Sequence, residues 1–143
     1  MTSYDTIFKQ TLRHISDPAI VQWPEEDLLN ELYGWLKIAI AKLPQLQDEL
    51  SDRDEFDVKN TETTGFHNDL SDTTQEVLAL SAVREWLRPQ INSTTHTLQS
   101  FSKKEGYSQK EHLAGLIALD ESLQLELKKL LRDVTYVNDE YFD

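Results

Sequence analysis

The residues of this chain that most resemble a chemical site are three closely spaced aspartates, Asp52, Asp54 and Asp57. Carboxylates at this spacing suggest a calcium loop, which needs oxygen ligands at alternate positions, a glycine at the sixth position and a glutamate at the twelfth. Counted from Asp52, the sixth residue is Asp57 and the twelfth is Thr63, so the pattern fails. We therefore predict a solvated acidic loop with no metal.

Other catalytic and metal-binding signatures are missing from the sequence. No two histidines are three or four residues apart, which excludes a helical zinc motif. The glycines are isolated, so there is neither a phosphate-binding loop nor a dinucleotide fingerprint, and no serine lies in a Gly-x-Ser-x-Gly turn. The chain has no cysteine, which excludes disulfides and thiolate sites. We expect a protein that is not an enzyme and that binds no cofactor. The histidines are His14, His67, His96 and His112.

The charge of the chain limits its partners. Its 143 residues are enough for one domain, and 26 acidic against 14 basic residues give a net charge of −12. Such a charge opposes binding to nucleic acid and to anionic membranes, but it suits a basic partner or a surface that DNA slides past. No signal peptide is visible, and the most apolar stretch is too short to span a bilayer. We expect a soluble protein made in a cytoplasm.

Four segments have the apolar spacing of three and four residues that is typical of helices. Acidic residues follow Pro24 at the start of the second segment, where the helix dipole favours them. Ser71 is expected to cap the third helix, and Ser108 with Glu111 forms a candidate capping box for the fourth. We therefore expect a mainly α, four-helix bundle-like protomer, with a single helical domain at 1–134. The predicted helices are Ser3–Ile15, Glu25–Leu43, Asp72–Leu87 and Gln109–Val134.

A proline interrupts the helical pattern directly after a tryptophan and an arginine. Pro89 has no N–H to donate to the carbonyl of Glu85, so the helix is expected to kink or end there. Trp86 and Arg88 at such a bend suit a docking element. The alternative is a helix end with Trp86 in the core.

The region 45–69 differs in kind from the helices, because it is rich in acidic residues and poor in apolar ones. It is expected to form either a long acidic loop or a short β-hairpin. The hairpin would pair Glu55–Lys59 with Gly65–His67 around a turn at Asn60–Thr64. Loops of this length in compact domains are usually functional or disordered.

The segment 135–143 combines acidic residues with Tyr136, Tyr141 and Phe142. A solvated tail rarely needs so many aromatic residues, whereas a docking tail uses them as anchors. The segment is predicted to be a C-terminal tail that docks on a neighbour. A tail that folds back on its own domain remains the alternative.

The order of these segments resembles the small neck proteins of tailed bacteriophages that infect Gram-positive hosts. Such proteins are head–tail connectors, or head-completion proteins, that act as adaptors below the portal. The resemblance covers about Ser3 to Asn138, although the acidic segment 48–64 is longer than that family leads us to expect. It is carried by Leu70-Ser71-Asp72, Glu76 to Leu80, Glu85 to Ile91, Tyr107-Ser108-Gln109 with His112-Leu113, and Thr135 to Asn138.

This resemblance implies a virion protein located in the phage neck. Copies of the chain would form a ring, commonly of about twelve subunits to match the portal, in a head-to-tail arrangement. Its partners would be the portal protein and the next neck or tail-completion protein, and the ring would pass DNA without binding it specifically. Trp86, Arg88, Tyr136, Tyr141 and Phe142 are the candidate interface residues.

Two other functions agree with the same sequence. The first is an acidic inhibitor, or DNA mimic, that occupies a basic cleft on another protein and carries its carboxylates on one face. The second is a four-helix enzyme with a carboxylate site in its core, which would require buried acidic residues on facing helices.

Overall fold

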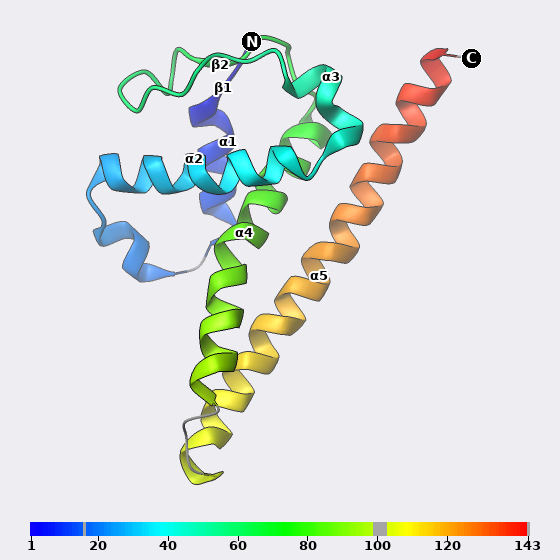
Figure 1. Ribbon diagram of the computed structural model, residues 1–143. Helices are drawn as coiled ribbons and strands as arrows, with labels where there is room; N and C mark the ends of the chain where they lie inside the picture. Colours follow the sequence, from blue (N-terminus) through cyan, green and yellow to red (C-terminus); the bar gives the residue numbers. More distant parts are fainter. Residues whose placement is uncertain (16, 99–102, 143) are drawn as a thin grey trace.

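The computed structural model describes residues 1–15, 17–98 and 103–142, and it describes their side chains except at 18, 21, 97–98, 103–108 and 135–142. The protein is mainly α, as the sequence predicts (Figure 1). Within the described part of the chain, no helix is both long and apolar enough to cross a bilayer. The elements are β1 (Thr2–Ser3), α1 (Tyr4–Arg13), a 3-10 helix (Pro18–Gln22), α2 (Glu25–Ala41), a second 3-10 helix (Pro44–Leu46), α3 (Gln47–Leu50), β2 (Gly65–Phe66), α4 (Asp72–Leu98) and α5 (Lys103–Phe142).

The central element is α4, against which α1, α2 and α5 all pack. The first half of α4 is buried on nearly every side, which is typical of a core helix rather than of a surface helix with one apolar face. Ser71 caps it as predicted, because the Thr74 N–H donates to the Ser71 hydroxyl at 3.1 Å. The buried apolar residues of α4 are Val77, Leu78, Ala79, Leu80, Ala82, Val83 and Leu87.

The expected helix end at Leu87 is wrong, because α4 continues through Pro89 to Leu98. Proline inside a helix removes one backbone hydrogen bond and costs about 3 kcal/mol. Pro89 is exposed, while Trp86 and Ile91 on either side of it pack against the core. Tertiary packing of α4 with α5 therefore outweighs the local effect of the proline.

The boundaries predicted for the last helix are also wrong, because α5 begins at Lys103 and ends at Phe142. Ser108 lies within this helix, so it does not act as an N-cap. The strong helix formers before it extend the helix despite Gly106. The backbone of 135–142 continues α5, and α4 and α5 lie side by side as an antiparallel pair (Figure 1).

The predicted hairpin within 45–69 does not form. The strand β2 pairs with β1 at the N-terminus instead, in antiparallel register with Thr2 opposite Phe66 and Ser3 opposite Gly65. A single bridge also joins Arg53 to Phe66. The segment at 55–59 contains no strand. Residues 51–64, between α3 and β2, therefore form a loop, called the acidic loop below, which is held to the N-terminus by pairing between residues far apart in sequence.

An aromatic cluster fixes this loop to the helices. Tyr4 is fully buried, and its ring lies 5.6 Å from that of Phe66 and 5.9 Å from that of Phe56. Phe56 also stacks on Tyr33 of α2 at 4.2 Å, with an interplanar angle of 6°. Phe56 belongs to the acidic loop but packs against the core. This packing explains why an apolar residue occurs among so many charged ones.

We predict that Gly65→Ala destabilises the protein by about 1–3 kcal/mol, the range for added bulk in a packed interior. A Cβ atom at Gly65 would lie 2.2 Å from the Thr2 carbonyl oxygen and 2.7 Å from the Ser3 Cα atom, so β1 would have to move away. Urea unfolding followed by circular dichroism measures the change.

Gly34→Ala is the matched control, because a Cβ atom there meets nothing within 4 Å and Gly34 lies inside α2. Alanine in a helix interior should raise the free energy of unfolding by about 0.5–1 kcal/mol. If the two variants were equally stable, the close approach of β1 and β2 would not constrain the fold.

Candidate functional site

A groove of about 590 Å³ runs between the C-terminal end of α2 and the middle of α5, over α4. It is formed because α2 and α5 both pack against α4 and leave a strip of that helix between them. Its volume falls in the range of about 300–1,000 Å³ that is usual for binding clefts. Its apolar lining comes from Ala39 and Leu43 on one side and from Leu125, Leu127 and Leu131 of α5 on the other.

The floor of the groove contains a buried carboxylate, Glu85, whose residue is 8% exposed. Its Oε1 atom accepts a hydrogen bond from Lys42 Nζ at 2.8 Å, and Arg88 Nη2 lies 3.5 Å from the same atom. A buried carboxylate needs such partners, because burying a charge without compensation is costly. Lys42 lies at the C-cap of α2, where the helix dipole favours a cation.

A second ion pair joins α4 to α5 beside the groove. Arg84 Nε donates to Asp120 Oδ1 at 2.9 Å, and Gln124 Nε2 donates to Asp120 Oδ2 at 2.7 Å. Burial of Asp120 favours its neutral form, but these two hydrogen bonds outweigh burial and place the pKa of Asp120 below its ordinary value. The carboxylate therefore stays ionised at neutral pH and holds Arg84 in place.

The charge of the groove is opposite in sign to that of the chain. The groove and its ion pairs contain four cationic side chains and three carboxylates, which leaves an excess of one positive charge: Lys42, Arg84, Arg88 and Lys128 against Glu85, Asp120 and Glu121. The chain as a whole carries −12. Apolar walls with a slight excess of positive charge suit an amphipathic helix that brings acidic residues.

Of the interface residues that the sequence predicts and whose side chains the structure describes, only Arg88 is brought to the groove. Arg88 reaches the groove through its contact with Glu85 and remains half-exposed. Trp86 is partly buried against the core and does not line the groove. The side chains of Tyr136, Tyr141 and Phe142 lie outside the described residues.

Sequence reasoning missed the groove residues Lys42, Glu85 and Leu125. The pairing of Lys42 with Glu85 spans 43 residues and leaves no local signal. For Leu125 the sequence does contain a signal. Leu123 and Leu127 have helical spacing on the packed side of α5, and Leu125 lies off that spacing. Its residue is 70% exposed, the highest value among the large hydrophobic residues described.

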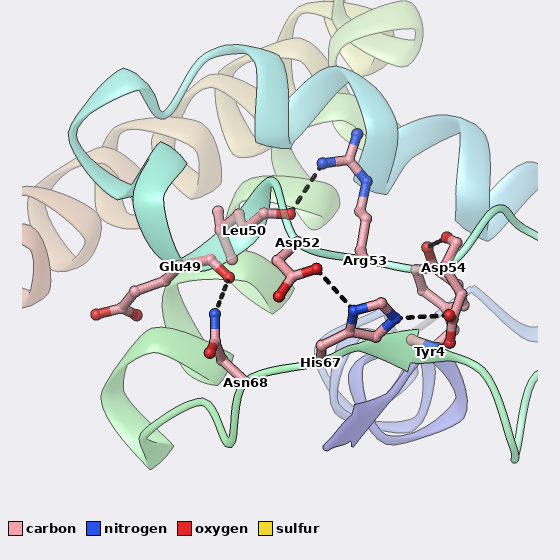
Figure 2. A network of polar contacts seen from close by, with 9 residues as sticks. Tyr4, Glu49, Leu50, Asp52, Arg53, Asp54, His67 and Asn68 are labelled. Atoms are coloured by element: carbon pink, nitrogen blue, oxygen red, sulfur yellow. Dashed lines mark hydrogen bonds and ion pairs between the residues drawn. The ribbon is translucent and has the colours of Figure 1, made fainter.

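A separate polar network orders the acidic loop (Figure 2). His67 lies between two carboxylates, with Nδ1 2.7 Å from Asp52 Oδ1 and Nε2 2.6 Å from Asp54 Oδ1. The Gly65 N–H donates to Asp54 Oδ2 at 3.1 Å, and the Tyr4 hydroxyl donates to the Asp54 carbonyl. Two sides of the loop are thus joined to each other and to α1.

This network around His67, called the loop clamp below, holds the two sides of the loop together. Each nitrogen of the His67 ring faces a different carboxylate, so the three groups do not converge on one point. Hydrogen bonds to Asp54 and Asp52 raise the pKa of His67 above its ordinary value, and burial raises the pKa of Tyr4 to about 12. Among the described residues, no three acidic or histidine side chains form a group that could hold a metal ion.

Comparison of this chain with protein-family models, with curated proteins and with solved structures finds no match. The case for a function therefore depends on the sequence patterns and on the geometry of the groove and the loop.

We predict that the loop clamp is strongest between about pH 4 and pH 6.5, the ordinary pKa values of Asp and His. The raised pKa of His67 stabilises the folded loop below about pH 6.5, and this contribution is lost as pH rises through the folded pKa. The pKa of Asp54 is lowered by its hydrogen bonds with His67 and the Gly65 N–H. Its contribution is therefore present above about pH 4 and is lost as pH falls through the folded pKa.

Amide hydrogen exchange at Asp54 and His67, corrected for intrinsic rates, measures this effect, because both N–H groups bond across the loop. His67→Gln should remove the loss of protection on going from pH 6 to pH 8. His96→Gln, an exposed substitution in α4, should leave it unchanged. The same pH dependence in wild type and His67→Gln would contradict the clamp.

Proposed function

We propose that this chain is a structural protein of the neck of a tailed bacteriophage. Copies of it would form a ring between the portal and the tail, and the ring would extend the DNA channel. Its partners would be further copies of itself, the portal protein and the next neck or tail-completion protein.

The observation that carries this proposal is the outer surface of α5. This helix has 40 residues against 27 in α4, and it packs on α4 through one side only. Ile117 is 40% exposed and Leu125 is 70% exposed. Large apolar side chains that remain exposed on a helix next to a groove are typical of a surface that contacts another protein.

The charge of the chain supports a place beside DNA. With a net charge of −12, each copy repels phosphate groups, and a ring would add the charge of every copy. A channel wall of this kind lets DNA pass without adhering, because binding to the phosphate backbone requires cationic side chains that release counterions.

The order of sequence segments supports the phage assignment. The segments that resemble neck proteins extend from the first helix to Asn138, and the mainly α protomer agrees with the fold that this resemblance implies. The resemblance is also the reason for proposing a closed ring rather than an open chain of copies.

We predict that the purified chain forms a closed oligomer with a mass many times that of one copy. Mass photometry in about 0.15 M salt, near physiological ionic strength, measures the mass, and negative-stain images should show rings with a central opening. The same sample should cause no gel shift of linear double-stranded DNA, because the field of the protein is repulsive.

A chain that stays monomeric at tens of micromolar would contradict the proposal and favour an acidic inhibitor. An open filament would contradict the ring while keeping self-assembly. A DNA shift that persists at about 0.15 M salt would contradict the role of the charge.

A further inference from the structure

We infer that the groove between α2 and α5 binds the acidic, aromatic segment 135–143 of a second copy of this chain. This inference rests on the proposed self-assembly and names the two surfaces that would meet. It assigns a role to the groove and to the C-terminal segment, which belong to different subunits at each contact.

The groove offers an uncovered apolar surface whose cations Lys42 and Arg84 are paired, while Lys128 and Glu121 of its lining are both exposed. Leu125 is 70% exposed on one wall, opposite Leu43, which follows α2. Lys128 is exposed and has no ion-pair partner among the residues that the structure describes. A ligand with apolar anchors and a negative charge would satisfy both features.

The segment 135–143 has this composition. Four of its residues are aromatic or aliphatic, three are acidic and none is basic, and its backbone is helical through Phe142. Val137 and Tyr141 are four residues apart, a spacing that places residues on one side of a helix. The segment thus combines apolar residues with a charge opposite to the excess in the groove, a composition that suits helix-in-groove recognition.

The segment cannot reach the groove of its own chain. One wall of that groove is α5 itself, from Glu121 to Leu131, and α5 is one helix from Lys103 to Phe142. Tyr141 lies roughly 15 Å beyond Leu131 along the axis, at 1.5 Å per residue. A helix does not fold back on its own side, and Figure 1 shows the last turns of α5 lying away from α2 and α4. The occupant must therefore come from another chain.

Such a contact joins two different surfaces of identical subunits. It is therefore head-to-tail, and each copy retains one free groove and one free segment until the assembly closes. A head-to-tail contact fits a ring. It also allows a sharp test, because a copy with a defective groove can still contact, through its segment, the groove of a copy whose segment is defective.

The test uses two full-length variants that are each defective on one surface. Leu125→Asp puts a carboxylate in the groove, where it repels the acidic segment. The double variant Asp139→Lys/Glu140→Lys reverses the charge of the segment. Each should raise the concentration needed for assembly at least about tenfold, which corresponds to about 1.4 kcal/mol per contact.

Leu119→Asp is the matched control, since Leu119 is exposed on α5 but does not line the groove. It should change the concentration needed for assembly less than about twofold. Equal melting temperatures check that all variants fold.

Mixing the two defective variants is the decisive step. The first keeps an intact segment and the second an intact groove, so the mixture should form one-to-one dimers that neither variant forms alone, detected by native mass spectrometry. If the wild type assembles and both variants assemble as well as Leu119→Asp, the inference is overturned while the proposed function stands. If the mixture yields no dimer although the wild type assembles, the inference is likewise overturned and the proposed function stands. A monomeric wild type overturns the proposed function, and with it this inference.

Discussion

The rest of the structure depends on the burial of α4 on nearly all sides. Its apolar residues between Val77 and Leu87 leave no side that water could cover without cost, so α1, α2 and α5 must each pack against a different part of it. The strip of α4 that is left between α2 and α5 is the floor of the groove. Glu85 lies on this strip, and its burial requires the cations of Lys42 and Arg88. The groove and its polar floor are thus consequences of how the core is closed.

The acidic loop is also ordered by interactions of its side chains, which here are an aromatic cluster and a histidine–carboxylate network. It is long for a connection within one domain, yet it carries Phe56 into the aromatic cluster around Tyr4. Its charges are arranged so that His67 lies between Asp52 and Asp54. The N-terminal strand and the loop therefore hold each other, while the groove, between α2 and α5, depends on the helices alone.

The sequence was informative where structure depends on neighbours in the chain. The helical spacing in 25–43 and 72–87 and the Ser71 cap are local, and each was predicted correctly apart from the exact helix ends. The predicted helix end at Leu87 was wrong, because packing across α4 and α5 outweighs one lost hydrogen bond. The pairing of Gly65 with Ser3 and of Glu85 with Lys42 joins residues far apart in sequence, and no local pattern encodes it. For the candidate site, Arg88 was singled out, whereas Lys42 and Leu125 required the structure.

The central claim is that copies of this chain meet through the groove of one and the C-terminal segment of the next. The chain has no cysteine, so single cysteines can report this contact directly. Leu125→Cys and Tyr141→Cys chains, mixed and oxidised under assembly conditions, should give mainly a disulfide between the two different variants. Leu125→Cys mixed with Leu119→Cys serves as the control. Disulfides only between identical variants, or none in an assembled sample, would contradict the account.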